Sequence, residues 1–513
     1  MADEAYKNAP ATIIARRHPE YIRMFPKWKF WFDSYMSPLD EYSSLYLFKN
    51  DKEGDEEFET RRKRAYRENH SKRVVDLINT YLFKEDAVRN TDNKFLKNFF
   101  ENADGKGKSL SRFMKNVSLF SSMLGRVYIV VDKMNPEVLT GTHKDNLDGQ
   151  VYCYMVLPTD VLDIAFNDDG SVKWALIKEV VRDDDDPFKS SCEMVTKYRL
   201  WHGGDWFLFD DGGNQVESGT TNLDVCPIIA VNNEETVSEY HAPSLISDVS
   251  YLDRAIFNNY SRLDVIVNDQ TFSQLIFPIE GAIVSDVIDN EDTREKFLTM
   301  ATNRILFYAS AAGEKPEFIS PDASQAEFIL SMIKHQTKQL YACMGLQNES
   351  SQEATDQSGI AKSYDFDKLN KLLASKADNL ELAEMRLLNA VKQWRGINTA
   401  QVEVDYPDEF DVKSLNQEIL IAQELALLDI SEKFIKEINK RVVMRALPKL
   451  PEDLQKAIFK EIDEKTYDPL MVSAGIQGLK SQNAKDESFS DKKGTGKKGG
   501  RLGQSQDKAD QMT

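Results

Sequence analysis

Apolar residues recur every three or four positions along a stretch that begins just after His241-Ala242-Pro243. This spacing places one apolar stripe along a helix, with polar residues on its other faces. Pro243 suits a first helical turn because proline lacks the N–H that would be unpaired there. The pattern predicts a long helix over 241–273, with a stripe made of Leu245, Ile246, Val249, Leu252, Ile256, Tyr260, Leu263 and Val267.

The spacing of apolar residues is no longer helical after this helix. Short strands are predicted over 274–278, 304–308 and 317–319, with a short acidic helix over about 290–300. A second long helix follows, since Ser320-Pro321 offers a cap and a first-turn proline. Gly345 is suited to end that helix in a left-handed conformation. Its apolar positions are Phe328, Ile329, Met332, Ile333, Leu340, Tyr341 and Met344.

A polar loop over 346–360 separates the second helix from a very long third helix, predicted over about 360–394. The loop contains acidic residues and no Lys or Arg. Its polar residues include Gln347, Asn348, Glu349, Ser350, Ser351, Gln352, Glu353 and Asp356. The apolar positions of the third helix are Phe366, Leu369, Leu372, Leu373, Leu380, Leu382, Met385, Leu388 and Val391.

The chain before residue 240 predicts an α+β domain of helices and an antiparallel sheet. Helices are expected over 57–83 and 110–124, and Gly125 leads from the second of these into a strand. The strands are expected over 127–131, 151–157, 172–181, 195–201, 206–209 and 228–231, with hairpin-turn signals at Asp168-Asp169-Gly170 and Asp211-Gly212-Gly213-Asn214.

Two clusters in this region allow more than one interpretation. The aromatic run from Trp28 to Phe32 suits a membrane interface or a stacking surface, but burial against the chain's own domain or a neighbour is favoured. The basic run Arg61-Arg62-Lys63-Arg64 suits phosphate. A solvated face or a set of ion pairs between subunits is favoured for this run.

The C-terminal part predicts a strand over 402–406 and helices over 415–428, 431–446 and 451–462. From about Gln477 the chain consists mainly of Lys, Gly, Ser, Gln and Asp. Such a tail buries too little apolar surface to order itself, so we expect it to be disordered.

The composition argues against a membrane-spanning protein and against a fold built on disulfides or zinc. The 513 residues are 41% hydrophobic, which suffices for two to four globular domains. No run of 18 apolar residues occurs, so no membrane span is predicted. The four cysteines are scattered, which indicates free thiols in a reducing cytoplasm and neither a disulfide framework nor a zinc site.

The sequence offers little catalytic chemistry. Asp183-Asp184-Asp185-Asp186 could bind a hard cation, but it lacks the ligand spacing of a calcium loop, so a solvated loop between strands is favoured. Gly494-Thr495-Gly496-Lys497-Lys498 lacks the glycine spacing of a phosphate-binding loop. The sequence contains neither H-E-x-x-H nor G-x-S-x-G. We therefore expect no enzyme activity, metal or cofactor.

The order of elements from 242 to 396 resembles the portal proteins, or head-to-tail connectors, of tailed double-stranded DNA bacteriophages. Short phrases add to the resemblance: Ser320-Pro321-Asp322-Ala323, Gln357-Ser358-Gly359-Ile360-Ala361 and Leu157-Pro158-Thr159-Asp160-Val161. The resemblance implies an N-terminal arm and wing (1–240), a first stem helix (241–273), a clip (274–320), a second stem helix (321–345), a channel loop (346–360), a long wing helix with a returning strand (361–410), a helical crown (411–476) and a disordered tail (477–513).

The same resemblance implies a dodecameric ring at one capsid vertex, through which the genome is packaged and ejected. It implies double-stranded DNA, terminase, a head-completion adaptor and the major capsid protein as partners. Terminase would supply ATP hydrolysis, and the clip would grip terminase during packaging and the adaptor afterwards. The location implied is the virion, after assembly in the host cytoplasm.

The candidate DNA-facing residues are the channel-loop residues and, on the second stem helix, Lys334 and Lys338. The net charge of −19 argues against a nucleic-acid clamp. An acidic wall suits a conduit, because it repels a sliding duplex from all sides within a Debye length of about 8 Å. Acidity that only keeps the protein soluble is the alternative. Lys334 and Lys338 would form basic rings if they face the lumen, and orientation toward solvent or a neighbouring subunit is equally compatible with the pattern.

Two other classes remain open. One is a different head–tail structural protein, an adaptor or scaffold without a DNA channel, although adaptors are usually shorter. The other is a nucleic-acid enzyme with an unrecognised site. A ring with a central hole would favour the portal, and a compact monomer would favour the enzyme.

Overall fold

The structure is a computed structural model that describes residues 10–133, 151–184, 186–221, 223, 225–271, 274–279, 305–309, 317–319, 323–346, 359–407, 410, 431–447 and 452–465. The chain divides into a unit over Met1–Phe410 and a second over Asp411–Thr513. The first unit contains helices and antiparallel sheets, so its fold class is α+β as predicted. None of the described helices combines the length and apolar character that crossing a bilayer requires.

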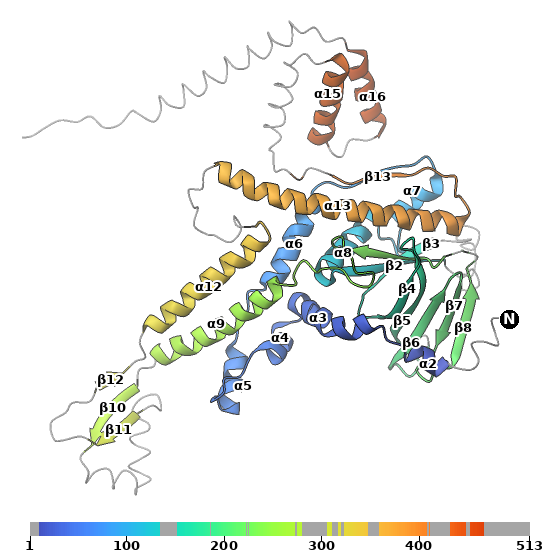
Figure 1. Ribbon diagram of the computed structural model, residues 1–513. Helices are drawn as coiled ribbons and strands as arrows, with labels where there is room; N and C mark the ends of the chain where they lie inside the picture. Colours follow the sequence, from blue (N-terminus) through green and yellow to red (C-terminus); the bar gives the residue numbers. More distant parts are fainter. Residues whose placement is uncertain are drawn as a thin grey trace, which may run out of the picture. The chain divides into compact units, whose positions relative to one another are not determined.

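Two antiparallel sheets, one of three strands and one of five, lie in the right-hand half of the view in Figure 1. In the smaller one, β2 (Arg126–Lys133) lies between β3 (Val151–Val156) and β9 (Ile228–Asn232). The larger has the order β4-β5-β6-β7-β8, in which each strand pairs with the next along the chain. Its strands are β4 (Val161–Phe166), β5 (Val172–Arg182), β6 (Met194–His202), β7 (Asp205–Phe209) and β8 (Gln215–Thr220).

Both faces of the larger sheet are covered. On β5, Ala175 and Ile177 belong to the main core, whereas Leu176 between them belongs to a smaller cluster on the opposite face. This alternation follows the two-residue period of a strand. The short helix α2 (Pro10–Ile14) packs Ile13 and Ile14 against the smaller cluster.

Helices surround the smaller sheet and share its core. Trp28 and Trp31 of α3 (Pro19–Met36) are buried, which confirms burial of the aromatic run in the chain's own domain. α8 (Leu110–Leu124) contacts α3, β2 and α6 (His70–Leu82). The remaining N-terminal helices are α4 (Leu39–Tyr46), α5 (Asp55–Arg64) and α7 (Lys94–Glu101).

A helical hairpin projects from these layers. The helix α9 (Val249–Thr271) leads to β10 (Gln274–Ile279), and α12 (Ala323–Cys343) returns beside α9 (Figure 1). At its tip, β10 pairs in parallel with β11 (Ile305–Ala309) and antiparallel with β12 (Glu317–Ile319). The three predicted tip strands are confirmed, and Gly345 has the left-handed φ of +68° expected after α12.

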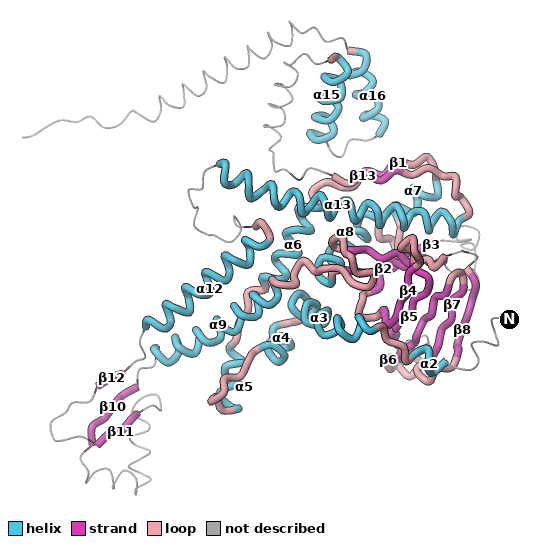
Figure 2. The backbone as a smooth tube through the Cα atoms, in the orientation of Figure 1, coloured by secondary structure: helices cyan, strands magenta, loops and turns pink. Residues whose placement is uncertain are grey.

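The long helix α13 (Gly359–Arg395) lies across the smaller sheet and contacts β2, β3 and β9 (Figure 2). β13 (Glu403–Asp405) then pairs antiparallel with β1 (Val88–Asn90). The predicted returning strand is therefore confirmed, and its partner is a strand that the sequence pattern did not indicate.

The second unit contains two described helices, α15 (Glu432–Ala446) and α16 (Glu452–Glu464). They are held together by Lys440, whose Nζ lies 2.7 Å from the Asp463 carboxylate, and by Lys436, which donates to the Asp463 carbonyl. These are two of the three helices predicted there. The helix over 415–428, the helix over 290–300 and the tail from 477 lie outside the described residues.

Two predicted helices have different limits. The helix predicted to open at Pro243 begins at Val249, because Ser244 and Leu245 are bonded to the end of α8. Ser244 Oγ donates to the Met123 carbonyl (2.6 Å), and the Leu245 N–H donates to the Ser122 carbonyl (2.9 Å). The helix predicted over 57–83 is two helices, α5 and α6, since Asn69 caps α6 by accepting from the Lys72 N–H (2.8 Å).

The residues between β9 and α9, over 233–248, form a lead-in segment that runs against Gly125. Gly125 has φ of +84°, and a Cβ there would lie 2.0 Å from the Ala242 carbonyl oxygen. No side chain fits this position without moving the segment.

Gly125→Ala is predicted to destabilise the first unit by about 3 kcal/mol or more, since it combines backbone strain with a backbone clash. Gly396→Ala is the matched control: Gly396 has φ of +73° but nothing within 4 Å of the added Cβ. It is expected to cost only the left-handed strain of about 1–2 kcal/mol. Denaturant unfolding of both variants measures the difference, and equal losses would contradict the close approach.

Candidate functional site

The hairpin of α9 and α12 is the candidate site indicated by the sequence. Ile256 of α9 and Ile333 and Leu340 of α12 are buried in the main core, and the two helices pack against each other. Asn259 Nδ2 also donates to Gln336 Oε1 across the pair at 3.0 Å. The apolar stripes and this hydrogen bond set the register between the helices, so the two helices form one element.

A buried ion pair attaches the base of α9 to the break between α5 and α6. Asp253 has no exposed surface, and its carboxylate accepts from the Arg67 guanidinium and from Ser71 Oγ (2.8 Å). Arg67 also donates to the Ser34 carbonyl (2.8 Å), and its guanidinium carbon lies 3.6 Å from the centre of the Tyr42 ring. Burial raises the pKa of Tyr42 to about 12, so its hydroxyl stays neutral.

The predicted basic run supports α9 from its side. Arg61 is buried, pairs with Glu53 at 2.6 Å and donates to Ser261 Oγ of α9 at 3.0 Å. Arg64 pairs with Asp264 of α9, and Arg62 pairs with Glu59 of its own helix. Arg61 is buried within the chain, so the favoured prediction of a solvated face or of ion pairs between subunits is wrong for that residue, whereas Lys63 and Arg64 are exposed, as a solvated face requires.

The base of α12 is joined to α6 by a neutral contact. His70 Nδ1 lies 3.2 Å from the Tyr341 hydroxyl, and both side chains are buried. Burial lowers the pKa of His70, so the ring is neutral near pH 7 and the contact is an uncharged hydrogen bond.

The long helix α13 has its own buried anchor. Glu384 has no exposed surface and accepts from Arg89 Nη2 (2.9 Å) and from the Tyr406 hydroxyl (2.6 Å). Arg89 also donates to Ser111 Oγ of α8 (2.7 Å). Because Arg89 belongs to β1 and Tyr406 follows β13, this network joins α13 to both strands and to α8.

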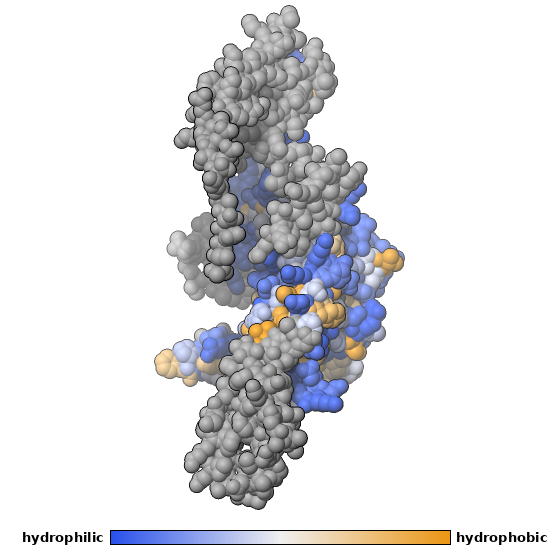
Figure 3. All heavy atoms as spheres, turned by 90° about the vertical axis from the view of Figure 1, so that its left-hand side faces the viewer, coloured by the Kyte–Doolittle hydropathy of each residue, from blue (hydrophilic) through white to orange (hydrophobic). Residues whose placement is uncertain are grey.

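The two predicted stem lysines lie on the outer surface of the hairpin. Lys334 and Lys338 are exposed, on the flank of α12 turned away from buried Ile333 and Leu340. Neither forms an ion pair with any residue that the structure describes. Phe328 and Met332 lie on the other exposed flank, 67% and 40% exposed. Figure 3 views this side and shows hydrophobic residues among hydrophilic ones.

The predicted channel-loop residues, over 347–356, lie outside the described residues, so no contact between them and the stem lysines is established.

The aspartate run Asp183-Asp184-Asp185-Asp186 has a local role at its two ends. Asp183 accepts from the Ser191 N–H (2.8 Å), and Asp186 accepts from the Phe188 N–H (2.9 Å). Both stabilise the turn between β5 and β6. Across the described ranges, no group of three or more His, Cys, Asp or Glu residues could hold a metal ion.

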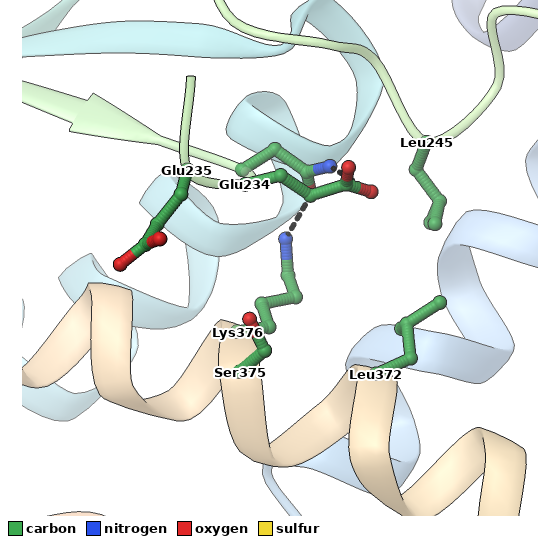
Figure 4. Close-up of a pocket in the computed structure, with 7 residues that line it drawn as sticks. Glu234, Glu235, Leu245, Leu372, Ser375 and Lys376 are labelled. Carbon is green, nitrogen blue, oxygen red and sulfur yellow. Dashed lines mark hydrogen bonds between the residues drawn. The ribbon is translucent and has the colours of Figure 1, made fainter. Parts of the chain in front are cut away.

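A pocket that the sequence pattern did not indicate lies beside α13 (Figure 4). It has a volume of about 300 Å³, and Lys376 Nζ donates to Asn233 Oδ1 there at 2.7 Å. Lys376 is only 3% exposed, and burial lowers the pKa of its amine to about 7, partly opposed by Glu234. The other lining residues are Glu234, Glu235, Leu245, Leu372 and Ser375.

Comparison with known proteins yields matches among solved structures alone. No protein-family model and no curated protein matches the chain. Among solved structures, a chain of the neck of an empty gene transfer agent (GTA) particle, computed with C6 symmetry, is 10% identical with a TM-score of 0.38, and the match covers 70% of this chain and 86% of that chain. A chain of the native GTA virion is also 10% identical, with a TM-score of 0.35, over 76% of this chain and 89% of that chain. At these values neither match assigns a function.

Asp253→Asn is predicted to destabilise the first unit by about 3–5 kcal/mol, because it leaves the buried Arg67 charge without its counter-ion. Asp264→Asn on the same helix is the matched control, since its pair with Arg64 is 33–37% exposed and such pairs contribute less than about 1 kcal/mol. Denaturant unfolding followed by tryptophan fluorescence compares them. A loss for Asp253→Asn no larger than the control's would show that the pair does not anchor α9.

Proposed function

We propose that this chain is a portal protein: copies of it form a ring around an aqueous bore at one capsid vertex, through which double-stranded DNA is packaged and ejected. The observation that carries the proposal is the α9–α12 hairpin, a pair of antiparallel helices with a small sheet at its tip. The resemblance in element order adds to it. The ring would be dodecameric.

The attachment of the hairpin fits a channel wall. A wall around a moving polymer has to keep its position, and α9 is linked to α5 through Arg61 and to the break between α5 and α6 through Arg67. Charge-assisted hydrogen bonds of this kind are the stronger class. The hairpin is therefore held on the side of α9 that faces α5, while the exposed flanks of α12 remain available for other contacts.

The charge distribution fits a duplex that slides. The chain has a net charge of −19, so a ring of many copies repels phosphate in general. Lys334 and Lys338 are exposed without a described carboxylate partner, so in a ring they form two basic bands that offset this repulsion locally. The affinity for DNA rises with the number of phosphates that Lys and Arg neutralise. Two basic bands neutralise few phosphates, so they hold the duplex weakly.

The partners follow from this arrangement. The tip sheet is the surface offered to terminase during packaging and to a head-completion adaptor afterwards, and the remaining contacts of the ring are with the major capsid protein in the virion. ATP hydrolysis belongs to terminase in this proposal, and the chain acts without a cofactor as a structural channel.

Assembly is the first test. Sedimentation velocity and native mass spectrometry of the purified full chain are expected to give a closed oligomer near twelve copies, the size that the resemblance implies. A chain that stays monomeric at high concentration would contradict the proposal. It would favour the alternative of a nucleic-acid enzyme, and a small open oligomer would favour an adaptor or scaffold.

The double variant Lys334→Glu/Lys338→Glu is predicted to reduce the yield of DNA-filled particles several-fold with ring mass unchanged, because it converts two attractive bands into repulsive ones. Lys94→Glu/Lys97→Glu on α7 is the control, since it reverses two exposed lysines of a helix outside the stem. DNA content of particles assembled with each variant is the measurement. Normal packaging and retention in the stem variant would remove these lysines from the channel.

A further inference from the structure

The pocket beside α13 lies outside the candidate DNA-facing residues and contains a buried lysine, Lys376. Lys376 occupies a position in the buried stripe of α13, where Leu369, Leu373 and Leu380 recur with it at helical spacing. A lysine is rarely that buried unless it is paired. No carboxylate lies within ion-pair distance of its amine in the described part of the chain.

The Lys376 amine has one hydrogen-bond partner and borders a pocket, so a small molecule in the pocket can reach it. Its one described hydrogen bond is to Asn233 Oδ1, and the pocket of about 300 Å³ opens beside it (Figure 4). The charged groups lining the pocket besides Lys376 are Glu234 and Glu235 of the lead-in segment, and both are exposed. A small molecule that enters meets the amine, the Ser375 hydroxyl and the side chains of Leu245 and Leu372.

Burial keeps much of this amine neutral at physiological pH. Its pKa is lowered to about 7, so the unprotonated amine is well populated near neutral pH. An ordinary lysine, with a pKa of about 10.4, is neutral in only about 0.04% of molecules at that pH. Because only the neutral amine is a nucleophile, desolvated lysines are the ones that form Schiff bases with carbonyl compounds.

We propose that Lys376 is a covalent capture site for small uncharged aldehydes. The Nζ lone pair attacks the carbonyl carbon, and the carbonyl oxygen gains a proton to give a carbinolamine. Loss of the nitrogen proton and of the hydroxyl as water then forms the C=N bond, so amine plus aldehyde gives imine plus water without an oxidant or reductant. The two rim glutamates disfavour anionic aldehydes, and the two leucines favour an apolar chain.

Imine formation changes the contact that Lys376 makes. A neutral imine nitrogen has no hydrogen to donate, so Asn233 Oδ1 loses its donor. Asn233 also donates from its backbone N–H to the Gly125 carbonyl (2.7 Å) and from Nδ2 to the Pro243 carbonyl (3.3 Å). Capture at Lys376 therefore acts on the residue that joins α13 to the lead-in segment of α9.

Reductive labelling of the full-length protein tests the site. Acetaldehyde with sodium cyanoborohydride ethylates amines through the imine, and peptide mass spectrometry gives the initial rate at each lysine. At pH 7, Lys376 is expected to react at least tenfold faster than exposed Lys334 and Lys338. A rate at Lys376 equal to or below theirs would overturn the proposal.

The pH profile separates a neutral buried amine from an accidentally accessible one. Relative to an amine with the ordinary lysine pKa of about 10.4, labelled in the same reaction, the rate at Lys376 is expected to be highest near pH 7. The ratio is expected to fall about tenfold per pH unit above about pH 8, because Lys376 is already neutral there and cyanoborohydride reduces both iminium ions under the same conditions. A ratio that does not change with pH would overturn the proposal.

Two rim variants provide a matched pair. Glu234 favours the protonated form of Lys376, so Glu234→Gln is expected to move the midpoint of the Lys376 profile to lower pH. Glu235→Gln removes the other rim carboxylate and is expected to leave the midpoint closer to that of the native chain. Both side chains are exposed, so neither change disturbs the core. Equal midpoints in the two variants would contradict the assigned electrostatics.

Discussion

The buried pair of Asp253 and Arg67 is the constraint on which the position of the hairpin depends. Both groups are shielded from water, so neither can lose the other without leaving an unpaired charge in the interior. Asp253 lies near the start of α9, and Arg67 lies in the short break between α5 and α6. The pair therefore sets where α9 leaves the sheet-bearing part of the unit, and α12 follows because its apolar stripe packs on α9.

Buried charged residues with polar partners also occur on α13. Glu384 is joined to Arg89 and Tyr406, and Lys376 is joined to Asn233, each within an otherwise apolar face. A long helix held only by apolar stripes could slide by one turn and still pack. A buried charged group would lose its partner in such a shift, so it does not allow the helix to slide. Such groups stabilise little relative to apolar residues, and their best attested effect is on register. This accounts for a long helix that contacts β2, β9 and β13 at defined positions.

The sequence predicted elements wherever local signals agreed with packing. The tip strands over 274–279, 305–309 and 317–319 and the end of α12 at Gly345 follow from period and turn chemistry. The start of α9 was wrong because tertiary bonds from Ser244 and Leu245 to α8 override the helical preference after Pro243. Strand β8 was missed because its residues are largely exposed and lack alternation.

The site residues were harder to predict than the elements. Lys334 and Lys338 were predicted because they lie four positions apart on the second stem helix. Their role in a channel stays a prediction, because their orientation in an assembly depends on a second copy of the chain. Asp253, Lys376 and Glu384 were missed, although each occupies a stripe position, as Asp253 does between Val249 and Ile256. A charged residue at the spacing of an apolar stripe is the signal that would have marked all three.

The central claim is that the α9–α12 hairpin lines a bore. An averaged electron-microscopy view of the assembled full chain along its symmetry axis tests this most directly. The account predicts an open hole whose innermost density is the pair of helices, with the flank of α12 that carries Lys334 and Lys338 turned toward the axis. A hole lined by the β4–β8 sheet, or a centre filled by folded polypeptide, would contradict it.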